Sequence, residues 1–212
     1  MRCRIMLSAL FNKKGDEARS DKWIFGVLLT FGIIGLIASF VLAVEEFHLL
    51  KNPDSILSCS FNLVLNCAAV MQTPQATVFG FPNMFIGLIG FPLVIMIALL
   101  GLSRVQFPRW FLMGAEIGVV FWTLFAYWLF FNSVYVIGVL CPWCLVVTFS
   151  MTILSAAITR YNLLHGTFDI PKRMNKKVTQ LLAKDYDKVI VAGWLVLLVG
   201  LVILRFGEAL VA

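Results

Sequence analysis

Long apolar runs constrain this chain more than any other feature. Trp23 to Val44 contains no charged residue, and similar runs follow at 84–102, 110–131, 141–160 and 189–204. About 20 apolar residues cross a bilayer as a helix, which satisfies its own backbone hydrogen bonds in lipid. With 61% hydrophobic and only 13% charged residues, the sequence predicts an all-α integral membrane protein with five transmembrane helices.

Basic residues lie mainly on one side of this predicted topology. Fifteen of the seventeen lysines and arginines fall in segments 1–22, 103–109 and 160–188, which share a side if there are five spans. Cytoplasmic segments beside spans are rich in Lys and Arg, so we expect a cytoplasmic N-terminus. The net charge of +6 then reflects topology, and no nucleic-acid partner is expected. The loop 45–83 and residues 132–144 should face outward.

A C-x-x-C motif, Cys141-Pro142-Trp143-Cys144, begins the fourth apolar run. Pro142 suits a first helical position, and both sulfurs would lie in the first turn. The positive end of a helix favours thiolate over thiol. At an outer face, where disulfides persist, the motif indicates a redox dithiol. Buried inert cysteines or a four-cysteine metal site are the alternatives, and we expect no metal.

A second cysteine pair, Cys59 and Cys67, lies in the loop 45–83. On one straight helix these cysteines would be about 12 Å apart, too far for a disulfide, which needs Cα atoms within about 7 Å. Either the segment bends between them, or each cysteine meets other partners in turn, as a thiol shuttle would. The run 61–71 is predicted to be a short interfacial helix. Cys3 should be an incidental cytoplasmic thiol.

A membrane quinone is the natural electron acceptor, because no haem, flavin or nicotinamide motif is recognisable in the sequence. It would need a pocket between helices with a few hydrogen-bond donors. Asn83, at the outer end of the second span, is a candidate donor or a helix cap. Thr73 is a cap, a turn residue or a group that holds the loop. Glu116 should be packed or protonated rather than catalytic, and His48 and His165 should lie at the surface.

The order and spacing of these residues resemble the vitamin K epoxide reductase (VKOR) family over roughly residues 20–160. The resemblance implies a four-helix transmembrane bundle around a quinone beside the C-x-x-C motif, here followed by a fifth transmembrane helix. It rests on Cys59-x7-Cys67, Thr73, Phe79-Gly80-Phe81-Pro82-Asn83, Gly87 and Cys141-Pro142-Trp143-Cys144.

The resemblance also implies roles for the four paired cysteines. Cys59 is expected to be the loop cysteine attacked by a partner's thiolate. Cys67 would be the shuttle cysteine that attacks Cys141. Cys144 would lie nearest the quinone and donate electrons to it.

Three polar positions refine this expectation. Asn83 matches the family position that hydrogen-bonds a quinone carbonyl, and Thr73 matches a Ser/Thr that secures the loop. Animal members have a Tyr four residues after the last active cysteine, where this chain has Thr148. Bacterial quinone reduction is therefore the expected activity, rather than vitamin K epoxide chemistry.

These points predict a multi-pass protein of the bacterial cytoplasmic (inner) membrane with its active site on the outer face. It would re-oxidise a separate DsbA-like thioredoxin-fold partner and reduce menaquinone or ubiquinone. The expected organisation is a cytoplasmic segment 1–22, a catalytic bundle 23–160, a basic cytoplasmic loop 161–188, and a fifth helix with a short outer tail, 189–212. A DsbB-type oxidase is the rival enzyme, although its C-x-x-C motif comes first in the chain rather than last.

Overall fold

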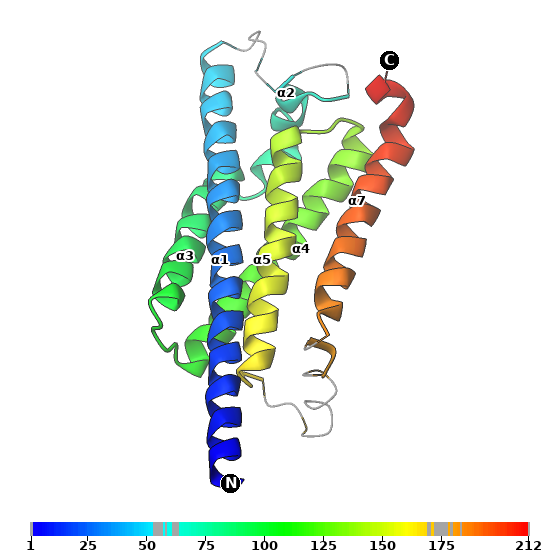
Figure 1. Ribbon diagram of the computed structural model, residues 1–212. Helices are drawn as coiled ribbons and strands as arrows, with labels where there is room; N and C mark the ends of the chain where they lie inside the picture. Colours follow the sequence, from blue (N-terminus) through cyan, green and yellow to red (C-terminus); the bar gives the residue numbers. More distant parts are fainter. Residues whose placement is uncertain are drawn as a thin grey trace.

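The chain forms a bundle of long helices that run side by side (Figure 1). The computed structural model describes residues 2–52, 57, 59–60, 64–168, 171, 178, 180–182 and 184–211. Five of the helices are long and apolar enough to cross a membrane, which confirms the predicted fold class. The elements are α1 (Arg2–Lys51), α2 (Cys67–Met71), the 3₁₀-helix η1 (Pro74–Thr77), α3 (Met84–Leu102), α4 (Arg109–Asn132), the π-helix η2 (Ser133–Ile137), α5 (Pro142–Leu164) and α7 (Tyr186–Val211).

α1 and α5 are the central helices of the bundle. α1 packs against α3 and α5, while α4 and α7 pack against α5. Figure 1 shows α7 at the edge, with the C-terminus at the same end of the bundle as α2. Phe25, Phe91, Leu154 and Tyr161 belong to the main apolar core between the helices. The other helices therefore pack around α1 and α5, and α7 lies on the outside of the bundle.

Two glycines allow α1 and α3 to approach closely. A Cβ atom at Gly35 would lie 2.2 Å from the Phe91 ring, and one at Gly87 would lie 2.2 Å from Ser39 Oγ. Small residues at helix interfaces permit such backbone approach in membranes, where packing drives helix association. The α1–α3 pair thereby forms one wall of the pocket described below.

α1 extends beyond the predicted first span at both ends. The predicted loop 45–83 begins too early, because Glu45 and Glu46 are still helical and the helix continues to Lys51. Glutamate is a strong helix former, so an acid that limits an apolar run does not stop the helix. This extension of α1 contributes to the packing around the cysteines, because Leu49 belongs to the apolar cluster that contains Cys59.

The predicted loop helix 61–71 is wrong in its first part. Residues 64–66 are not helical, and α2 begins at Cys67; residues 61–63 lie outside the described residues. Asn66 is the N-cap, and its side-chain oxygen accepts a hydrogen bond from Ala69 N–H at 3.2 Å. A capping Asn starts a helix at the next residue, so the helix forms only after Asn66.

The end of the bundle opposite α2 is tied together by polar contacts. Arg109 donates to the carbonyls of Gly166 and Thr167, and Arg160 forms an ion pair with Asp187 at 2.6 Å. These contacts fix α4 to the end of α5 and fix α7 to α5. Four cations of the predicted basic loop, Lys172, Arg173, Lys176 and Lys177, lie outside the described residues.

Candidate functional site

A short backbone pairing brings the two cysteine pairs together. Leu65 and Leu140 form an isolated parallel β-bridge. Leu140 donates to and accepts from the segment 64–66, with N···O distances of 2.7 and 3.0 Å. Because the paired segments run in the same direction, Cys67 and Cys141 follow the bridge side by side. This long-range pairing, rather than helix packing alone, aligns the loop with the C-x-x-C motif.

Cys59 and Cys67 form a disulfide, with their Cα atoms 5.7 Å apart. The segment therefore bends between them, which was one of the two expected alternatives. Cys67 Sγ also lies 3.2 Å from Cys141 Sγ, while Cys141 and Cys144 are free thiols. Cys59, Cys67 and Cys141 are all at most 1% exposed. The contact places Cys141 where thiol–disulfide exchange with Cys67 needs it.

Cys141 is the N-cap residue of α5, and Pro142 takes the first helical position as predicted. Cys141 Sγ accepts a hydrogen bond from Cys144 N–H at 3.4 Å. The hydrogen bond from the Cys144 side chain, followed by bonds from backbone N–H groups, lowers the pKa of Cys141 against the opposing effect of burial. Cys141 is therefore the cysteine of this motif that holds a thiolate most readily.

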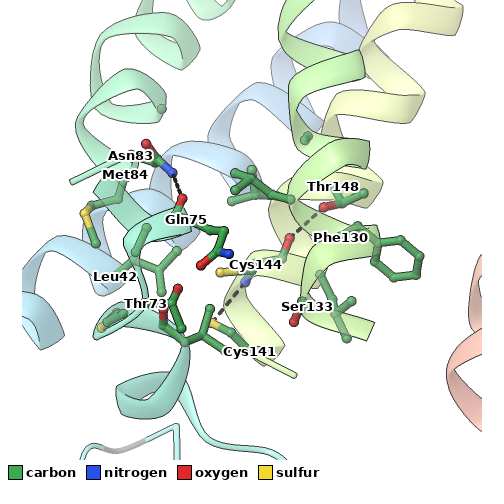
Figure 2. Close-up of a pocket in the computed structure, with 18 of the residues that line it drawn as sticks. Leu42, Thr73, Gln75, Asn83, Met84, Phe130, Ser133, Cys141, Cys144 and Thr148 are labelled. Atoms are coloured by element: carbon green, nitrogen blue, oxygen red, sulfur yellow. Dashed lines mark hydrogen bonds between the residues drawn. The ribbon is translucent and has the colours of Figure 1, made fainter. Parts of the chain in front are cut away.

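A pocket opens beside the C-x-x-C motif (Figure 2). Its cavity volume is about 140 Å³. Its walls come from α1, α3, α4 and α5, with the segment 70–76 on one side, and Cys141 and Cys144 lie on its surface. Most of the lining is apolar. The polar lining residues outside the motif are Ser39, Thr73, Gln75, Asn83, Ser133 and Thr148.

Asn83 and Thr73 both line this pocket. Asn83 occupies the N-cap position of α3 but makes no side-chain capping bond, so its interpretation as a cap is wrong. Instead its Nδ2 donates to the backbone carbonyl of Gln75 at 2.7 Å (Figure 2), and its buried Oδ1 has no hydrogen-bond partner among the described residues. Thr73 Oγ1 donates to the Val70 carbonyl at 2.7 Å and so closes the end of α2.

Sequence reasoning missed three polar residues of the pocket. Gln75 lies between Thr73 and Asn83, and its position between two candidates is the one signal that was present. Ser39 faces the pocket from α1 where Gly87 approaches it. Ser133 lies in the π-helix η2 and lines the pocket. No periodic pattern in the sequence predicts a π-helix.

The remaining candidates lie away from the pocket. Glu116 is buried, and its carboxyl group contacts Thr159 Oγ1 at 2.6 Å and Asn162 Nδ2 at 2.9 Å. This joins α4 to α5, as expected for a packed acid. His48 and His165 are exposed, as predicted. Within the part of the chain that is described, no group of three or more His, Cys, Asp or Glu side chains could hold a metal ion.

The fold and the site together define a multi-pass helical membrane protein with two cysteine pairs that meet beside an apolar pocket. The chain matches the vitamin K epoxide reductase family over residues 26–159. This match covers more than half of the chain, and the protein belongs to that family of membrane oxidoreductases. The matched range includes all four paired cysteines and ends within α5, so α7 lies outside it. No individually curated protein matches the chain.

Proposed function

We propose that this protein re-oxidises an extracytoplasmic DsbA-like thioredoxin-fold partner and passes two electrons to a membrane quinone, menaquinone or ubiquinone. The 3.2 Å contact between Cys67 Sγ and Cys141 Sγ carries this proposal. It joins the loop disulfide to a dithiol whose second member, Cys144, lies on the wall of an apolar pocket. A protein with static disulfides has no need of a free thiol against a disulfide sulfur.

The proposed cycle moves electrons inward by successive exchange. The partner's thiolate attacks Cys59, and Cys67 leaves as a thiolate. Cys67 then attacks Cys141 of a Cys141–Cys144 disulfide and frees Cys144. The partner's second thiol completes the partner's disulfide and releases Cys59, which returns to Cys67 and frees Cys141. Two electrons and two protons pass from the Cys141–Cys144 dithiol to the quinone, giving a quinol and re-forming the disulfide.

The oxidation pattern of the structure corresponds to one stage of this cycle. The Cys59–Cys67 disulfide is formed and Cys141 and Cys144 are reduced, which is the stage just before quinone reduction. Cys59 is 1% exposed, so a partner reaches its sulfur only when the loop opens. The contact between Ser60 Oγ and Asn66 Oδ1, at 2.9 Å, is one that such opening would break.

The orientation and organisation follow from the charge pattern. We assign segments 1–22 and 161–188 to the cytoplasm of a bacterium, residues 23–160 to the catalytic bundle, and residues 189–212 to the fifth helix and its outer tail. The cysteines then lie at the outer end of the inner membrane, where a thioredoxin-fold partner is found in an oxidising compartment. In the pocket, Asn83 is assigned to a quinone carbonyl and Thr73 to holding the loop.

Trapping of mixed disulfides tests the relay. In membranes that contain the native partner, Cys67→Ser should accumulate a mixed disulfide through Cys59. Its free Cys59 thiol attacks the disulfide of the oxidised partner, and no Cys67 thiol is present to displace the partner by re-forming the Cys59–Cys67 disulfide. The adduct should vanish in the Cys59→Ser variant and be unaffected in a Cys3→Ser control. Quinone reduction should be lost in Cys144→Ser. If no adduct forms and both loop variants reduce quinone at the normal rate, the loop relay is wrong.

A further inference from the structure

The hydroxyl groups of the pocket are largely unable to donate to a ligand. Thr73, Ser133 and Thr148 each already donate to a backbone carbonyl, of Val70, Val139 and Cys144 respectively. A hydroxyl carries a single proton, so these three groups can only accept a hydrogen bond from a bound molecule. A quinone offers carbonyl oxygens, which only accept. These hydroxyls therefore suit a quinol better than a quinone.

Because these hydroxyl groups already donate to the backbone, side-chain amides are the remaining side-chain groups that could donate a hydrogen bond to a carbonyl ligand. An amide NH₂ group has two protons. Asn83 uses one of them on the Gln75 carbonyl, which leaves one. Ser39, the fourth hydroxyl of the pocket, is only 1% exposed and lies against Gly87. Gln75 is thus the second amide among the described lining residues.

Gln75 is held in place by its backbone. It lies in η1, where its carbonyl accepts from Asn83 Nδ2 at 2.7 Å, and the next residue, Ala76, accepts from Asn83 N–H at 2.9 Å. Its side chain is half-buried although most of the segment 72–81 is exposed. Figure 2 shows this side chain directed into the pocket, toward Cys144. A surface glutamine would point the other way, into solvent.

We propose that Gln75 binds the quinone, with its side-chain NH₂ group donating to a ring carbonyl beside Cys144. This rests on the proposed function and adds a second amide donor to Asn83. Two thiols and a quinone give a disulfide and a quinol, so the carbonyl oxygen gains negative charge as the electrons arrive. A donor fixed beside that oxygen strengthens its bond as the charge develops. Gln75 is then a substrate-binding residue that sets quinone affinity and turnover.

Steady-state kinetics of the full-length protein in liposomes test this proposal. Short-chain ubiquinone and menaquinone analogues serve as acceptors and dithiothreitol as the thiol donor. Gln75→Leu should lower kcat/KM for quinone about 5- to 10-fold, the effect of losing one hydrogen bond that is partly charge-assisted. The KM for dithiothreitol should not change. Gln72→Leu is the matched control, because Gln72 is exposed and only three residues away.

A second variant and a direct measurement separate binding from folding. Gln75→Glu keeps the size of the side chain and removes the amide protons, so it should show at least the loss of Gln75→Leu. Infrared difference spectra should show the carbonyl stretch of bound quinone at lower frequency in the wild type than in either variant. If the wild type is active and both variants have unchanged kinetics and an unchanged carbonyl band, the proposed role of Gln75 is wrong. The proposed function is not affected by that result. A wild type that reduces neither quinone overturns the proposed function as well.

Discussion

The two cysteines of the C-x-x-C motif have different surroundings, although they are three residues apart. Cys141 is 1% exposed and contacts Cys67. Cys144 is less buried and lies on the wall of the pocket with Thr148 (Figure 2). Both cysteines line the pocket, and Cys141 is the one of the two that also contacts the loop disulfide. The direction of electron flow that we propose follows from this division.

The side-chain hydrogen bond from Cys144 is the largest cause of the lowered pKa of Cys141. Because it stabilises the thiolate, its loss raises the pKa, and less thiolate remains at any given pH below the new value. In the Cys144→Ala variant we therefore expect the alkylation rate of reduced Cys141 to rise with pH through a midpoint that lies higher than in the wild type. Site-resolved mass spectrometry after iodoacetamide treatment measures this midpoint.

Cys144→Ser provides the matched comparison for this experiment. A serine hydroxyl can still donate to the Cys141 thiolate, so its midpoint should lie below that of Cys144→Ala. Backbone N–H donors at the start of α5 are the same in both variants. Equal midpoints in the wild type and in both variants would show that the side chain at position 144 does not tune Cys141.

At the scale of elements, α7 is connected to the redox motif by a chain of hydrogen bonds. Trp194 Nε1 donates to Tyr127 OH at 2.9 Å, and that hydroxyl contacts Thr152 Oγ1 at 2.8 Å. Thr152 donates to the Thr148 carbonyl at 2.8 Å, and the Thr148 hydroxyl donates to the Cys144 carbonyl at 2.9 Å. The chain runs from α7 through α4 to the first turns of α5. α7 thus supports the helix that carries the dithiol.

Removing the first hydrogen bond of this series, from Trp194 to Tyr127, should weaken the packing of α7 on the bundle. Interhelical hydrogen bonds in membranes contribute about 0.6 kcal/mol on average, and about 1 kcal/mol changes Tm by roughly 2–4 °C in chains of this size. We expect Trp194→Phe to lower Tm in detergent by about 1–3 °C, and to have little further effect in a Tyr127→Phe background. Trp110→Phe, at a side chain that is 74% exposed, is the control. A full additional loss in the double variant would mean that Trp194 acts independently of Tyr127.

The helices could be predicted from the sequence more fully than the site. Apolar runs indicate membrane spans because each run must cross the bilayer on its own, so all five spans were predicted, although the first helix continues to Lys51, beyond the predicted end of its span. The cysteine relay depends instead on the bridge between Leu65 and Leu140, two residues that are 75 positions apart in a chain with no local strand pattern. The same holds for Gln75, whose direction is set by Asn83 reaching back to its carbonyl.

At the scale of the whole molecule, the two ends of the bundle differ in chemistry. One end carries the four paired cysteines and the pocket. The other end carries the ion pair of Arg160 with Asp187 and the contacts of Arg109 with the end of α5. Arg109 and Arg160 also belong to the basic segments that indicate the cytoplasm. The orientation that we propose accordingly places the cysteine end outside and the arginine end in the cytoplasm.

This orientation is tested by labelling single cysteines in intact cells, in a variant without the five native cysteines. Asn52→Cys lies just beyond α1 at the cysteine end, and Ser103→Cys follows α3 at the other end; both positions are exposed. Since the basic segments should face the cytoplasm, a membrane-impermeant maleimide should label Asn52→Cys at once and Ser103→Cys only after the cells are permeabilised. The reverse pattern would place the disulfide relay in the cytoplasm, where thiols are kept reduced. A role in oxidising extracytoplasmic partners would then be untenable, even if the cysteine chemistry and the quinone pocket were correct.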